Sequence, residues 1–326
     1  MRSGCIPMKK TVILKDSNSD HGWQRTPEAL FHALKEGGYE SDIVNFEISM
    51  LVNEKEKWKD ALFFNTVVGK MGAKTQAIVA AVLQSLGYDF VGSSSKTHFL
   101  CLDKSITKAI LKEYGIPTPR FDVFDGSRYL LQTEFDVPVF IKPSSEGSGI
   151  GINENSLIMK KDLISSRVQK LYERFHQKIL VEEHLPGREF TVGIIGNAPH
   201  LTVLPILEID LSDLPEGVEK YYSERVKEDY ADETRYFCPA NLPFQLYEEI
   251  RDITYRTFEV LECRDFARID FRLDSQNKPY VIEVNSLPGL DPINSDLPKM
   301  AKAMNSDYKD LVIKITQVAL SRISKG

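Results

Sequence analysis

The sequence predicts an α/β protein of two or three compact units, because its 326 residues exceed the usual domain size of about 100–200 residues. Its first hundred residues alternate between short apolar runs and helical stretches, the pattern of a parallel sheet covered by helices. A glycine-rich segment follows a predicted strand near residue 143, and two neighbouring predicted strands near residue 280 alternate charged and apolar residues. Both features are typical of sites that bind phosphates or metal ions.

The first unit should contain the parallel sheet and the helices that cover it. A helix is predicted to begin near Pro27, because proline is favoured at the first helical position, and to end at Gly37-Gly38. Residues 73–86 are also predicted to be helical. We expect the strands of this unit at residues 11–14, 42–46, 61–65 and 88–92.

The second unit should begin near Cys101 with a helix over residues 103–114, because a Gly-then-Pro stop signal follows directly. Strands are expected at 138–143 and 178–183, on either side of a helix near 160–175.

The third unit should contain a hairpin of two strands and two helices, at residues 266–274, 279–284, 243–260 and 306–322. Residues 210–235 are polar and long, and they are either a solvated loop or a mobile lid. We therefore place the units at residues 1–100, 101–189 and 190–326.

Composition excludes several classes of protein. The net charge of −6 and the pI near 5.7 argue against nucleic acid or an anionic membrane as the main partner. The four cysteines form no CxxC pair, which disfavours a disulfide framework or a zinc site and fits a reducing compartment. No apolar run approaches the roughly 20 residues that span a bilayer. We therefore expect a cytoplasmic protein without nucleic-acid or membrane partners, and leave both a monomer and a homodimer open.

The predicted hairpin carries the strongest chemical signal. Side chains alternate along a strand, so Asp270 should share a face with Arg268 and Arg272, while Glu283 should share a face with Asn285. Strict alternation places the apolar partners on the opposite face, namely Ile269, Phe271, Leu273, Tyr280, Ile282 and Val284.

Three oxygen donors should therefore lie together on the hairpin, from Asp270, Glu283 and Asn285. Such hard donors are the ligands that Mg²⁺ prefers. The alternative is the solvated side of an amphipathic hairpin. The turn that ends at Gly289 favours the metal site, because it brings backbone N–H groups next to the carboxylates.

Two further segments are ambiguous when each is taken alone. Lys142 precedes a Ser- and Gly-rich loop at 144–151, which is either a phosphate-binding loop or a flexible hairpin loop and matches neither the Walker A nor the dinucleotide pattern. The acids Glu182, Glu183 and Glu189 surround a Leu-Pro-Gly turn. They either bind an adenine amino group and ribose hydroxyls or are exposed acids at strand ends.

Seven segments together resemble the D-alanine–D-alanine ligases of the ATP-grasp superfamily, in order and in spacing, from about residue 61 to the C-terminus. The segments are 103–108, 115–119, 141–148, 181–192, 236–240, 268–271 and 283–289.

The resemblance implies a three-unit ATP-grasp architecture, in which ATP is gripped between two antiparallel sheets. It also implies ATP-dependent ligation of a carboxylate to an amine through an acyl-phosphate, with release of ADP and phosphate. The expected substrates are small-molecule carboxylates and amines, either amino acids or a peptide. The expected cofactors are ATP and two Mg²⁺ ions, with Mn²⁺ as an alternative.

Residue roles follow from the matched positions. ATP should be contacted by Lys104, Lys142, Ser148, Glu182, Glu183, His184, Leu185 and Glu189. The metal ligands should be Asp270, Glu283 and Asn285. Arg268 and the N–H of Gly289 should stabilise charge in the reaction, Ser148 should lie in the loop that covers the phosphates, and Ser295 should bind a substrate carboxylate.

The chain departs from these ligases around the amino-acid sites. Residues 15–21 lack the usual Ser-x-Glu, and residues 68–74 lack the usual histidine and acidic pair. The Lys-Tyr pair of the lid is replaced near 227–230, and the segment after Gly289 is one residue longer than usual. These departures leave open an ATP-binding protein without ligase activity, or a small-molecule kinase, and they question D-alanine as the acyl donor.

Overall fold

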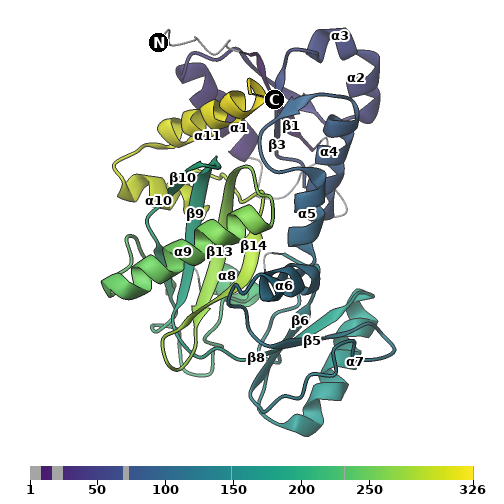
Figure 1. Cartoon of the computed structure of the whole chain (residues 1–326), viewed down its shortest axis with the longest axis vertical. Coiled ribbons are helices and arrows are strands. Elements are labelled where there is room, and N and C mark those ends of the chain that lie inside the picture. Colours follow the sequence, from purple (N-terminus) through teal and green to yellow (C-terminus); the bar gives the residue numbers. More distant parts are fainter. Residues whose placement is uncertain (1–8, 17–24, 69–72, 148, 231, 326) are drawn as a thin grey trace.

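The computed structural model describes residues 9–16, 25–68, 73–147, 149–230 and 232–325, and these form three separate sheets (Figure 1). The first sheet is parallel, in the order β2-β1-β3-β4. Its strands are β1 (Thr11–Lys15), β2 (Ser41–Asn45), β3 (Leu62–Asn65) and β4 (Asp89–Phe90). The helices around it are α1 (Arg25–Glu36), α2 (Ile48–Asn53), α3 (Lys55–Trp58), α4 (Ala73–Ser85) and α5 (Ser95–Leu102).

Strands β1 and β3 are buried along almost their whole length, as expected for central strands with helices on both faces. The predicted strand at 88–92 is correct only for Asp89–Phe90. At Gly92 the chain takes a φ of +101° and its N–H donates to the carboxylate of Asp265 at 2.8 Å. The chain therefore turns away from the sheet towards the third unit.

The second sheet is antiparallel, in the order β5-β8-β6-β7. It consists of β5 (Phe121–Phe124), β6 (Val139–Pro143), β7 (Leu157–Ile158) and β8 (Ile179–Glu183), with a 3-10 turn (Lys161–Leu163) and α7 (Ile164–Phe175) on one side. Helix α6 (Lys104–Glu113) is capped by the preceding residue, Asp103, whose carboxylate accepts from the N–H of Ser105. Although α6 precedes this sheet in the sequence, its Leu111 is buried in the core of the third unit.

The third sheet runs in the order β12-β11-β9-β13-β14, with β10 beside β9. Its strands are β9 (Glu189–Asn197), β10 (His200–Val203), β11 (Leu207–Asp210), β12 (Arg235–Phe237), β13 (Asp265–Leu273) and β14 (Pro279–Asn285). The helices are α8 (Glu224–Asp229), α9 (Phe244–Val260), α10 (Asp296–Ala303) and α11 (Tyr308–Ile323). Residues 210–235, predicted to be a loop or a lid, therefore contain a short helix.

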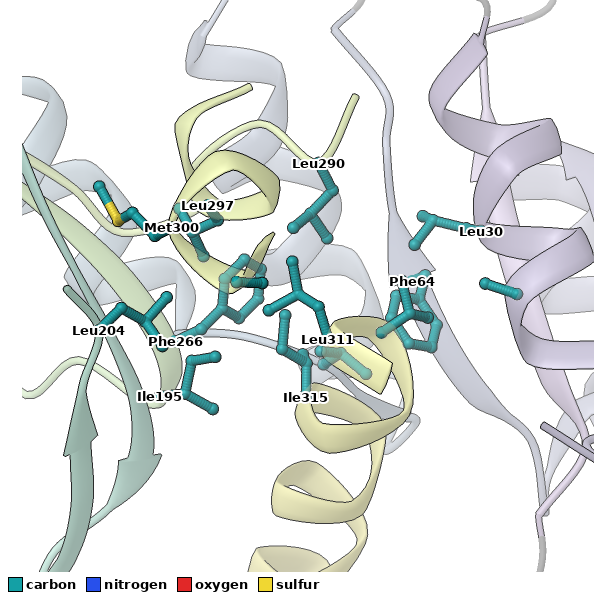
Figure 2. Packing of buried hydrophobic residues seen from close by; sticks show 14 of the residues in the cluster. Leu30, Phe64, Ile195, Leu204, Phe266, Leu290, Leu297, Met300, Leu311 and Ile315 are labelled. Carbon is teal, nitrogen blue, oxygen red and sulfur yellow. The ribbon is translucent and has the colours of Figure 1, made fainter. Parts of the chain in front are cut away.

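One large core joins the first and third units. Leu30 and Phe64 of the first unit pack with Phe266 of the sheet and Ile315 of α11 in a single cluster (Figure 2). A buried ion pair of the third unit lies at this joint, because the carboxylate of Asp265 accepts from Nε and Nη2 of Arg322 at 2.9 and 2.8 Å. The pair contacts the first unit through the N–H of Gly92, which donates to Asp265, and the carbonyl of Phe90, which accepts from Arg322. The second sheet has its own smaller clusters. Within the described residues, no helix has both the length and the apolar character that crossing a membrane requires.

Candidate active site

The hairpin of β13 and β14 carries the predicted metal ligands in the expected register. Asp270 lies opposite Glu283, and Arg268 lies opposite Asn285. The pairing shifts between Asp270 and Phe271, where β14 carries an extra residue. These positions therefore bring the two carboxylates and the amide together on one surface of the hairpin.

The bulge changes which residues of β14 face the core, so the sequence prediction was wrong at this point. Strict alternation placed Tyr280 and Ile282 with Val284 on the core face, but both are only half-buried, and Tyr280 lies opposite Arg272. The buried pair is Val281 and Val284, at 1% and 3% exposure. An extra residue changes the phase of alternation, because side chains repeat every two positions. The bulge thus allows both valines to reach the core while Glu283 stays on the polar surface.

Asp270 is the most heavily hydrogen-bonded acid of this surface. Its Oδ1 accepts from Thr191 Oγ1 at 2.6 Å and from Arg268 Nε at 2.9 Å. Its Oδ2 accepts from Arg268 Nη2 at 3.0 Å and from Asn285 Nδ2 at 2.9 Å. Burial alone would raise the pKa of Asp270, but Arg268, Thr191 and Lys227 together outweigh burial and hold the pKa below its ordinary value. Asp270 is therefore an anion at neutral pH.

Glu283 pairs with Lys104, whose Nζ lies 3.0 Å from Oε1 and also donates to the carbonyl of Glu146. Lys104 is 6% exposed, so it is not the surface lysine that its isolated sequence context indicated. Asp270, Glu283 and Asn285 together offer two carboxylates and one amide carbonyl. This is a donor set that fits Mg²⁺. Elsewhere in the described ranges, no cluster of three His, Cys, Asp or Glu side chains offers a metal site.

A second charged group lies between β6, β8 and α6. Glu182 is 4% exposed, so it is not an exposed acid at a strand end. Its Oε1 pairs with Lys142 at 2.5 Å and its Oε2 lies 3.0 Å from Nζ of Lys108. Burial lowers the pKa of Lys108 to about 8, although Glu182 opposes the shift. Lys108 was not predicted as a site residue, and only its place in the 103–108 segment could have indicated it.

The neighbouring predicted residues occupy different environments. The carboxylate of Glu183 accepts from the N–H and from Nε of Arg120, at 2.9 and 3.0 Å. Leu185 is buried. Burial, followed by the charge of Arg272, lowers the pKa of His184 to about 4, so its imidazole is neutral at pH 7. Burial raises the pKa of Glu189, whose Oε2 lies 3.4 Å from Arg272 Nη1.

The segment after β14 contains two more of the predicted residues. Gly289 follows the turn directly, and Ser295 begins α10. The Oγ of Ser295 accepts from the N–H of Asp291 at 2.9 Å. Ser286 Oγ lies 2.7 Å from Nδ1 of His98, a buried histidine on α5 that was not predicted to take part. Ser148 lies outside the described residues.

Comparison with known proteins decides the family. A model for the C-terminus of D-alanine–D-alanine ligases matches residues 110–317. A D-alanine–D-alanine ligase of Carboxydothermus hydrogenoformans is 32% identical over 307 residues, covering 91% of this chain and 93% of the relative. The chain belongs to the D-alanine–D-alanine ligase family.

Other relatives agree with the family assignment. A D-alanine–D-alanine ligase of Bordetella petrii is 32% identical over 243 residues, covering 74% of this chain and 71% of that ligase. The crystal structure of the Bacillus anthracis ligase complexed with ATP aligns with a TM-score of 0.77 at 25% identity, over 98% of this chain and 100% of that one. The predicted ATP-grasp fold and the predicted ATP-dependent ligase class are therefore confirmed, and the two alternative functions find no support.

The candidate lid, residues 210–235, brings a lysine close to the hairpin acids that was not among the predicted residues. Lys227 of α8 lies within electrostatic range of Glu283, Asp270 and Glu189, and burial lowers its pKa despite these acids. The lid also reaches the second sheet, because Tyr221 Oη donates to the carbonyl of Asn153 at 2.7 Å. The lid therefore contacts both sheets of the ATP-grasp architecture. The sequence had indicated only that the usual lid pair is replaced near 227–230.

Proposed function

We propose that this ligase joins a small-molecule carboxylate to an amine through an acyl-phosphate, with ATP bound between the second and third sheets. The supporting observation is the hairpin register, which places Asp270 opposite Glu283 beside Arg268. The donor and the acceptor are amino acids or a peptide. The proposal places the unit boundaries at residues 100/101 and 189/190. It also includes a cytoplasmic location. If the protein self-associates, the proposed form is a homodimer.

Metal ions would be held by Asp270, Glu283 and Asn285, as two Mg²⁺ ions or as Mn²⁺ in their place. Bound there, they would neutralise charge on the phosphates of ATP. Lys104 and Lys142 would add two further positive charges near the phosphates, and Ser148 would lie in the loop that covers them. Glu182 and Glu189 would bind the adenine and the ribose, with the backbone of 183–185 beside the ring.

The reaction then proceeds in two balanced steps. A donor carboxylate oxygen forms a bond to the γ-phosphorus as the bond to ADP breaks. The amine nitrogen then forms a bond to the acyl carbon, and the bond from that carbon to the phosphate oxygen breaks. The ammonium loses two protons in all, one carried by the phosphate and one released to water.

Three protein groups would act on the acyl carbon and its neighbourhood. Arg268 and the N–H of Gly289 would stabilise the oxyanion of the tetrahedral intermediate. The lid with Lys227 would exclude water, which otherwise hydrolyses the acyl-phosphate.

The test is a donor screen with two readouts. Each candidate carboxylate is incubated with ATP, Mg²⁺ and hydroxylamine, and ADP and the acyl-hydroxamate are measured together. We expect stoichiometric ADP and hydroxamate for at least one amino acid or dipeptide. Tight ATP binding without either product across a broad panel would contradict ligation. ADP with a stable phosphorylated product and no hydroxamate would indicate a kinase.

A further inference from the structure

An acidic side chain lies next to Arg268 at the beginning of α10. Oδ2 of Asp296 is 3.3 Å from Nη1 of Arg268, and its Oδ1 is 3.2 Å from Nζ of Lys299. The Asp296 side chain is 13% exposed, so a ligand can still reach it. No role was predicted for this residue.

Two tyrosines complete this part of the site. Tyr222 of the lid and Tyr236 of β12 share a hydrogen bond between their hydroxyls at 2.6 Å. Nζ of Lys299 lies 3.9 Å from the centre of the Tyr236 ring. Tyr222, Tyr236, Asp296 and Lys299 thus form a wall beside Arg268. This wall combines two phenol groups with one carboxylate, and Lys299 and Arg268 already contact that carboxylate.

This wall is where the acceptor must lie, if the proposed function holds. The amine attacks the acyl carbon beside Arg268, so the substituents of the acceptor point towards the surrounding side chains. The beginning of a helix such as α10 ordinarily attracts an anion. Here Asp296 already occupies the first turn of α10.

The cationic side chains beside Asp296 already form ion pairs within the protein. Arg268 divides its guanidinium between Asp270 and Asp296. Lys299 contacts Asp296. A carboxylate on the acceptor would therefore approach a fixed carboxylate whose two cationic neighbours are already paired, and like charges at short range repel.

We propose that Asp296 selects an acceptor whose amine is next to a neutral polar group instead of a carboxylate. An amino-acid amide has this chemistry, and so does the N-terminus of a peptide. The hydroxyl of Ser295, one residue before Asp296, would donate to the neutral carbonyl of such an acceptor. This inference rests on the proposed ligase function and adds the class of acceptor to it.

The experiment compares matched acceptors with a donor that forms a hydroxamate. D- and L-alanine are measured against D- and L-alaninamide, with products identified by mass spectrometry and kcat/KM determined for each. We expect the wild type to prefer the amide of at least one enantiomer by tenfold or more over the free acid. A wild type that uses the free acids as well as the amides would overturn the proposal, and this outcome requires no variant.

A substitution then assigns the preference to Asp296. Asp296→Asn should reduce the amide-to-acid ratio by about tenfold, which corresponds to about 1.4 kcal/mol. Asp310→Asn removes the same charge from the first turn of α11 and should leave the ratio unchanged. An unchanged ratio in Asp296→Asn would overturn the proposal. Hydroxamate formation is measured separately, because its absence would contradict the ligase function rather than the choice of acceptor.

Discussion

Arg268 holds the carboxylate of Asp270 with two hydrogen bonds, from Nε to Oδ1 at 2.9 Å and from Nη2 to Oδ2 at 3.0 Å. The two residues are two positions apart on β13, so their side chains lie on the same face of the strand. Only a planar guanidinium provides such a two-pronged contact and still has Nη1 free for a third partner, here Asp296. Arg268 therefore holds the carboxylates of Asp270 and Asp296 in position and also adds a positive charge to the site.

We expect Arg268→Lys to lower ligation by about 100-fold or more, the usual effect of losing a donor to an oxyanion. The positive charge is retained, so the loss would report geometry rather than charge. Steady-state ADP release and hydroxamate formation measure the effect. Arg256→Lys, on the exposed side of α9, is the control and should leave ADP release and hydroxamate formation nearly unchanged. Near-normal turnover in Arg268→Lys would remove Arg268 from the catalytic groups.

Glu283→Gln should abolish turnover while the protein stays folded. The substitution removes one negative charge from the proposed metal ligands and leaves Lys104 without its partner. ADP release is measured over a Mg²⁺ titration, with circular dichroism as the check on folding. Glu259→Gln, an exposed acid on α9, should behave like the wild type. Normal activity of Glu283→Gln at ordinary Mg²⁺ would indicate that the hairpin surface is merely a solvated face.

Arg322→Met should lower the free energy of unfolding by about 3–5 kcal/mol, because it leaves the fully buried Asp265 carboxylate without its cation. Urea denaturation measures the loss. Lys96→Met breaks the exposed pair with Glu262 and should cost less than about 1 kcal/mol. Equal effects of the two substitutions would mean that the buried pair contributes no more to stability than an exposed one.

His98 should make stability depend on pH between about 4 and 6.5. Burial, followed by the charge of Arg264, lowers the pKa of His98 to about 4, whereas the unfolded chain has the ordinary value of 6.5. The unfolded state therefore binds more protons in this range, and stability falls as pH is lowered, by up to about 3 kcal/mol. Above pH 6.5 the contribution is constant.

Urea denaturation tests this dependence at about pH 4.5 and 5.5, within the titration range, and at about pH 7, above it. His98→Asn should make the curve less steep, with a remainder from His184, whose pKa is also lowered to about 4. His32→Asn, at the surface of α1, should leave the curve unchanged. A wild-type curve that is already flat would contradict the buried neutral imidazole.

Patterns within short segments predicted much of the fold. The alternation of charged and apolar residues in β13 placed Asp270 correctly, because a strand without a bulge follows its period strictly. The same rule failed for Ile282, since one extra residue in β14 is visible only against its partner strand. The shortened strand β4 has a similar cause, because Gly92 is drawn towards Asp265, which lies 173 positions away in the sequence.

Site residues that depend on distant contacts were also missed. Lys108 lies in a recognisable segment, but its role depends on Glu182, which lies on another element. His98 carries no local signal for its contact with Ser286. Lys227 lies on α8, within electrostatic range of the hairpin acids, and no local pattern relates it to them. In each case the position of the side chain depends on packing between elements that sequence periodicity does not relate.

The single core shared by the first and third units has a mechanical consequence. Leu30, Phe64 and Ile315 belong to one cluster, and Asp265 and Arg322 of the third unit hydrogen-bond to Gly92 and Phe90 of the first. The sheet of β5 to β8 has separate clusters. It meets the rest through residues 210–235, through the pair of Glu182 with Lys108 of α6, and through a few backbone hydrogen bonds, such as Val281 N–H to the Pro117 carbonyl. Nucleotide exchange is therefore expected to involve rotation of the β5–β8 sheet as a rigid body relative to the first and third units. The hinges would lie near residues 117 and 187.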